Sequence, residues 1–111
     1  MEKALSFVQQ FDTSSVVQLA VKLTAGSELV MKYVESDIGL TETQAIALAS
    51  LFSDVPIEEI MATKFLEYLN NRNFVLAGNL FLSFNKVNRV ASMAKTRRRK
   101  AEQTLFNCKE I

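Results

Sequence analysis

Residues 95–106 read KTRRRKAEQTLF, and this stretch decides between two descriptions of the chain. Five of its first six side chains are basic, which is typical of a surface that contacts phosphates. Its second half places Leu105 and Phe106 after Ala101 at the spacing of a helix that packs on a core. Because successive positions on a helix point all round its axis, at least one of the arginines must face other protein.

The composition is that of one compact folded protein. The chain has 111 residues, 49% of them hydrophobic, with only 3 glycines and 1 proline, so we expect residues 1–111 to form a single domain. The single cysteine, Cys108, excludes an intramolecular disulfide. The absence of histidine excludes the common histidine-dependent catalysis and histidine-containing metal sites, and we expect no metal or cofactor.

The charge is unevenly distributed along the chain. Residues 1–71 hold 4 basic and 10 acidic side chains, a net charge of −6, whereas residues 72–111 hold 9 basic and 2 acidic ones, a net charge of +7. This polarity either steers an anionic partner towards the C-terminal half or holds the two halves of one fold together. The sequence leaves both explanations open.

Apolar residues recur at helical rather than strand spacing, which predicts an all-α bundle of about five to six helices. Thr41 and Gln44 form a capping-box pattern that starts one helix, and Gly26 with Ser27 either bends or splits another. The basic stretch either extends the last long helix or forms a separate one. The expected helices cover about residues 2–10, 15–36, 42–53, 56–69 and a long segment from 74, with an apolar stripe of Leu80, Phe84, Val87, Ala91 and Ala94.

No segment has the roughly 20 apolar residues of a membrane span, and the N-terminal residues lack the apolar run of a signal peptide. We therefore expect a cytoplasmic protein without a membrane span.

Four sequence elements follow one another in order. They are Leu40, Thr41, Gln44, Ala47, Leu48 and Ser50; Leu69 and Asn70; Phe84, Asn85 and Lys86; and Arg97, Arg98, Arg99, Ala101, Glu102, Leu105 and Phe106. Together they resemble the C-terminal helical lobe of the phage-type lysozymes, the family of muramidases that includes the bacteriophage T4 and lambdoid-phage endolysins. The resemblance is strongest over residues 40–106 and implies a lysozyme-like helical fold.

The same resemblance implies a lost active site. Asp12 stands at the position comparable to the family's catalytic glutamate, but its side chain is shorter by one methylene. Between Asp12 and Leu40 there is no room for the small β-rich lobe that carries the second catalytic groups. Because a glycosidase needs two positioned groups that flank the bond, we expect no catalytic residues and no enzyme activity. An arginine of the family's terminal helix pairs with the catalytic glutamate, so the resemblance implies that Arg97 or Arg98 pairs with Asp12.

Three functional hypotheses follow. The first is a non-catalytic, lysozyme-derived phage or prophage protein, located in the host cytoplasm, that binds a protein: a host factor, a lysis or virion component, or a second copy of itself. The second is a nucleic-acid-binding module that uses the basic C-terminal helix. The third is residual peptidoglycan binding or weak muramidase activity. The candidate binding residues are Lys86, Arg89, Lys95, Arg97, Arg98, Arg99 and Lys100.

Overall fold

A computed structural model of the chain describes residues 2–108, and their fold is helical, as predicted. Residue 1 and residues 109–111 of the predicted domain lie outside the described residues. Within 2–108 there are seven α-helices, one short 3-10 helix and one two-stranded hairpin. The elements are α1 (Glu2–Val8), α2 (Val16–Tyr33), α3 (Glu42–Asp54), α4 (Ile57–Met61), α5 (Phe65–Asn70), α6 (Phe74–Leu80), η1 (Phe81–Phe84), β1 (Lys86–Val87), β2 (Val90–Ala91) and α7 (Met93–Phe106).

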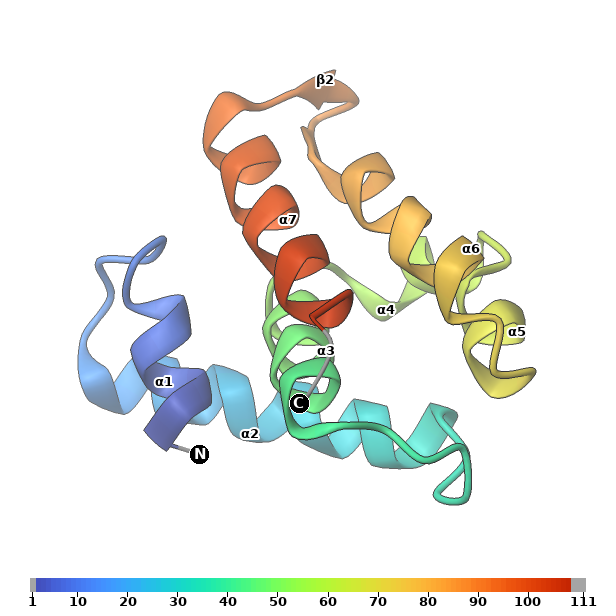
Figure 1. The fold of residues 1–111 in the computed structure, drawn as a ribbon. Coiled ribbons are helices and arrows are strands. Elements are labelled where there is room, and N and C mark those ends of the chain that lie inside the picture. The colour runs from blue at the N-terminus through green and yellow to red at the C-terminus, as the bar shows by residue number, and fades with distance from the viewer. Residues whose placement is uncertain (1, 109–111) are drawn as a thin grey trace.

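Helix α3 occupies the centre of the fold and packs against α1, α2 and α7 (Figure 1). Helix α1 lies at one end of the molecule and α5 and α6 at the other, while α2 runs beneath both parts. The main core is rich in phenylalanine, and the ring of Phe81 lies 5.5 Å from that of Phe65 and 5.1 Å from that of Phe106, between centroids. A smaller apolar cluster joins α1 to α2 and α3. Within residues 2–108, none of the helices combines the length and apolar content that a membrane span requires.

Local capping explains where two of the helices begin. Thr41 accepts a hydrogen bond from the backbone N–H of Gln44, and the Gln44 side chain accepts one from the N–H of Thr41, which confirms the predicted capping box. Ser15 and Gln18 form the same arrangement at the start of α2. Helix α2 then continues unbroken through Gly26, where a Cβ atom would lie only 2.8 Å from the carbonyl oxygen of Ala49. The glycine therefore serves close packing of α2 on α3.

The prediction of one long helix beyond residue 74 is wrong. Helix α6 ends at Leu80, and the 3-10 helix and the hairpin separate it from α7, so Val87 and Ala91 lie in strands. The two turn residues, Asn88 and Arg89, have φ angles of 51° and 69°, as a type I′ turn requires. Residues 86–91 can therefore form a hairpin with a two-residue turn, although the spacing of their apolar residues also fits a helix. The register pairs Lys86 with Ala91 and Val87 with Val90.

The segment predicted as one helix over 56–69 is also divided. The Thr63 hydroxyl donates to the carbonyl oxygen of Ile60 at 2.8 Å and accepts a hydrogen bond from the N–H of Phe65 at 3.2 Å. These side-chain bonds compete with the helical ladder, and they separate α4 from α5.

Replacing Arg89 by glycine is expected to raise the free energy of unfolding by about 0.5–1 kcal/mol, because an arginine in the left-handed region carries steric strain that glycine lacks. Thermal unfolding followed by circular dichroism measures the change. Arg89→Ala is the matched control, since it removes the same charge and keeps the strain. An equal gain in both variants would show that charge, and not backbone conformation, limits stability at this turn.

Candidate binding site at the basic helix

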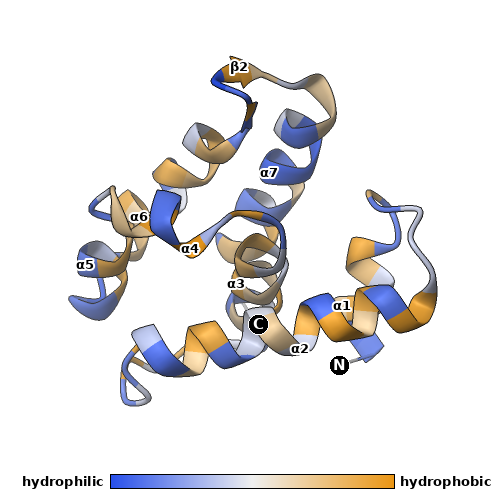
Figure 2. Cartoon of the chain, turned by 180° about the vertical axis from the view of Figure 1, so that it is seen from behind, coloured by the Kyte–Doolittle hydropathy of each residue, from blue (hydrophilic) through white to orange (hydrophobic). Residues whose placement is uncertain are grey.

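Helix α7 is strongly hydrophilic, yet it packs against the apolar helix α3 (Figure 2). Arg98 and Arg99 point inward and are only 5% and 0% exposed. Glu102, one turn further along, is fully buried beside them. The expectation that at least one arginine faces the interior is confirmed, and two of them do so.

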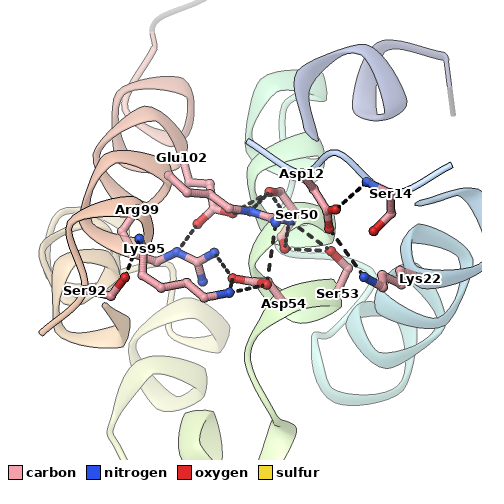
Figure 3. A network of polar contacts seen from close by, with 11 residues as sticks. Asp12, Ser14, Lys22, Ser50, Ser53, Asp54, Ser92, Lys95, Arg99 and Glu102 are labelled. Atoms are coloured by element: carbon pink, nitrogen blue, oxygen red, sulfur yellow. Dashed lines mark hydrogen bonds and ion pairs between the residues drawn. The ribbon is translucent and has the colours of Figure 1, made fainter. Parts of the chain in front are cut away.

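The buried side chains of α7 meet the last two turns of α3 in a charged network, formed by Ser50, Asp54, Lys95, Arg98, Arg99 and Glu102 (Figure 3). Asp54 is its acidic centre on α3. Its carboxylate lies 2.7 Å from both the Nζ atom of Lys95 and an Nη atom of Arg99, and 3.6 Å from an Nη atom of Arg98. Three cations of the basic stretch thereby share one carboxylate of α3.

Glu102 is the second acid of the charged network. Its carboxylate oxygens lie 2.9 Å from the Nε atom of Arg99 and 3.4 Å from that of Arg98, and it accepts a hydrogen bond from the Ser50 hydroxyl. Arg98 also donates to the backbone carbonyl of Ser50 at 3.1 Å. Each buried guanidinium group therefore contacts at least one carboxylate and is fixed against α3.

Burial and pairing act in opposite directions on these acids. Burial disfavours the ionised form of Asp54, but Arg98 and Lys95 outweigh it and hold the pKa of Asp54 below its usual value. At Glu102 burial is the stronger effect and raises the pKa. Because Glu102 is fully enclosed, it has no route to a polymeric substrate.

The prediction that Arg97 or Arg98 pairs with Asp12 is wrong. The Asp12 carboxylate accepts the backbone N–H of Ser14 at 2.9 Å and lies 3.4 Å from the Nζ atom of Lys22. Arg97 donates to the carbonyl oxygen of Gln10 at 3.2 Å, and Arg98 is held by the charged network. Asp12 and Arg98 line the same cavity of about 10 Å³, roughly the smallest space that holds one water molecule. Arg98 instead contacts Asp54 on α3 at 3.6 Å.

Hydrogen bonds from the hydroxyl and the N–H of Ser14, aided by Lys22, lower the pKa of Asp12 to about 2. A lowered pKa in the folded state means that the ionised carboxylate stabilises the fold above about pH 4 and that this contribution is lost as the pH falls towards 2.

We expect a carboxyl titration followed by NMR to give a midpoint of about 2 for Asp12. The Ser14→Ala variant should raise this midpoint, whereas Ser6→Ala on the exposed side of α1 should leave it unchanged. A normal midpoint in the wild-type protein would contradict the assignment.

The predicted binding residues do not form one continuous surface. Arg98 and Arg99 are buried and Lys95 is half-buried, whereas Lys86 and Arg89 are exposed on the hairpin. Arg97 and Lys100 are exposed on α7.

A second feature of α7 is an open depression of about 550 Å³ beside the α1–α2 connection. We call it the α7 depression, and its lining residues are Phe11, Met93, Ala94, Thr96, Arg97 and Lys100. The guanidinium carbon of Arg97 lies 5.4 Å from the centroid of the Phe11 ring, a cation–π contact across one side of the depression. Sequence reasoning missed Phe11 as a site residue, because its spacing after α1 indicates core packing.

Among residues 2–108, acidic and cysteine side chains do not gather in threes as a metal site would require. The charged network holds its carboxylates against arginine and lysine, so it offers no ligand set for a cation.

Comparison with known proteins shows a distant and partial similarity. No family model matches the chain. Over 69 residues it is 35% identical to the endolysin of Bacillus phage B103, a match that covers 62% of this chain and 26% of that protein. The matched part thus spans about a quarter of the endolysin's length. The chain is similar to a phage endolysin over this segment.

Proposed function

We propose that this protein is a phage lysis-related protein that binds a protein partner and does not cleave peptidoglycan. The partial similarity to a phage endolysin supports the relation to lysis. The ionisation and burial of Asp12, Asp54 and Glu102 support the absence of cleavage. The exposed apolar side chains of α2 support the binding of a partner.

The contacts of Asp12 with Ser14 and Lys22 carry the non-catalytic part of the proposal, because both favour the ionised carboxylate. A muramidase needs a general acid that is protonated near neutral pH, and a pKa of about 2 leaves Asp12 ionised there. Asp54 is compensated by three cations, and Glu102 is enclosed. None of these three carboxyl groups combines protonation at neutral pH with access to a saccharide.

Exposed apolar side chains favour a binding function. Val16, Val17 and Val21 on the outer face of α2 are 54%, 73% and 65% exposed, and they line a shallow depression of about 570 Å³. Grouped apolar side chains of this kind mark protein contact sites more often than single ones do. The depression is completed by Ala20, Thr24, Ala25 and Glu28.

Two assays test the proposal. Purified protein should not clear a suspension of bacterial cell walls at any pH between about 5 and 8, the range in which most proteins are most stable. Clearing that disappears in the Asp12→Asn variant would overturn the non-catalytic part.

A pull-down from phage-infected cells should recover a protein that is lost with Val21→Asp and kept with Val75→Asp. Val75 on α6 is the matched control, because it is also a highly exposed valine, at 73%.

A further inference from the structure

The α7 depression joins an apolar floor to the positive charges of Arg97 and Lys100. Phe11, Met93 and Ala94 supply the apolar lining, and Met93 is 91% exposed. Arg97 and Lys100 lie one turn apart on the same face of α7, at the edge of this lining. A ligand that fits must therefore combine an apolar group with negative charge.

The two cations of the depression differ from their neighbours on α7. Lys95, Arg98 and Arg99 each contact a carboxylate of the charged network. Arg97 and Lys100 form no ion pair with any acid among residues 2–108. The fold thus pairs the inner half of the basic stretch with carboxylates, whereas the outer half has no ionic partner among residues 2–108.

Arg97 is already held in place. Its guanidinium group stacks near the Phe11 ring and donates one hydrogen bond to the carbonyl oxygen of Gln10. A guanidinium group has five N–H donors, so others stay available for a carboxylate. Because its position is fixed before binding, less side-chain entropy is lost when a ligand arrives.

We propose that the α7 depression binds an acidic peptide segment of a partner protein, with its carboxylates at Arg97 and Lys100. An apolar side chain of the same segment lies on Phe11 and Met93. This inference rests on the proposed function in one respect, namely that the partner is a protein.

Single-stranded nucleic acid fits the depression less well. It needs aromatic faces on which bases stack and a continuous track of cations for the phosphates. The lining contains a single aromatic ring, that of Phe11, and the two central arginines of the stretch are buried. A peptide needs only the two cations and the apolar floor.

The test is fluorescence anisotropy with a labelled synthetic peptide of alternating glutamate and leucine, added to the full chain at low salt. We expect saturable binding that weakens with salt. A peptide with glutamine for glutamate, or with glycine for leucine, should bind at least about fivefold more weakly, because each lacks one half of the required chemistry. Equal binding of the three peptides, or no binding of the first, would overturn the proposal.

Three variants localise the binding. Arg97→Glu combined with Lys100→Glu should weaken it by about tenfold or more, and Met93→Ser by about threefold. The matched control is Lys64→Glu combined with Lys86→Glu, which makes the same charge change at exposed lysines outside the depression and should stay within about twofold. Circular dichroism spectra establish that each variant is folded.

An equal loss in the control would show unspecific charge attraction and would contradict the proposed site. Tighter binding of a short single-stranded DNA, with the same sensitivity to Arg97 and Lys100, would replace the peptide by nucleic acid. The cell-wall assay is independent of these measurements. Clearing by a protein that binds the peptide would refute the proposed function alone, and absent peptide binding without clearing would refute this inference alone.

Discussion

Replacing Asp54 by alanine is expected to lower the free energy of unfolding by about 3–5 kcal/mol. Asp54 contacts two arginines whose side chains are 6% and 0% exposed. Without its carboxylate, these guanidinium groups keep the cost of burial, while Arg99 loses its closest compensating charge and Arg98 keeps only Glu102. Urea unfolding followed by circular dichroism measures the loss.

Lys95→Ala is the matched control for Asp54→Ala, since it removes another member of the charged network without leaving a buried charge unpaired. The side chain of Lys95 is 34% exposed, so its loss should cost no more than about 1 kcal/mol. Equal losses in the two variants would mean that the guanidinium groups rearrange towards solvent when Asp54 is absent. The network would then be less rigid than the structure indicates.

Replacing Gly26 by alanine is expected to destabilise the fold by about 1–3 kcal/mol, although alanine is the better helix former. The new Cβ atom would lie 2.8 Å from both the carbonyl oxygen of Ala49 and the backbone nitrogen of Ser53. Backbone atoms of a helix cannot relieve this clash by changing rotamer as a side chain can, so α2 and α3 must move apart. The same urea unfolding measurement determines the size of the effect.

Thr24→Ala provides the control on the same helix. Thr24 is exposed, and its hydroxyl bonds only to the carbonyl oxygen of Ala20 one turn earlier. Its replacement should change the free energy of unfolding by less than about 0.5 kcal/mol. If Gly26→Ala were as mild as this control, the close approach of α2 to α3 would not be needed for stability.

Helix starts could be predicted from the sequence because capping is local. Thr41 and Gln44 are three residues apart, and the backbone groups that they satisfy lie within the same turn. The hairpin could not be predicted in this way. Val87 and Ala91 are spaced by four residues, which fits a helix, and the turn depends on left-handed conformations at Asn88 and Arg89. Arginine rarely adopts that conformation, so the residue type gave no signal.

The candidate site was predictable only in part. Inward-facing arginines follow from the helical periodicity of the basic stretch, but the identity of their partner depends on tertiary packing. Asp54 lies 45 residues before Arg99 and precedes a proline at a helix end, where an aspartate ordinarily marks a chain break. The resemblance to lysozymes implied Asp12 as the partner of an arginine, whereas the buried arginines contact Asp54 and Glu102.

The distance in sequence between Asp54 and Arg99 has a consequence for synthesis on the ribosome. A growing chain completes α3, with Asp54 at its end, before any of its arginine partners has been made. At ordinary elongation speeds the addition of the 45 residues that follow Asp54, up to Arg99, requires roughly 2–9 s, far longer than a helix needs to form. During this interval the face of α3 that packs against α7 in the folded protein stays exposed. Chaperones can therefore contact this face of the nascent chain until α7 has been synthesised.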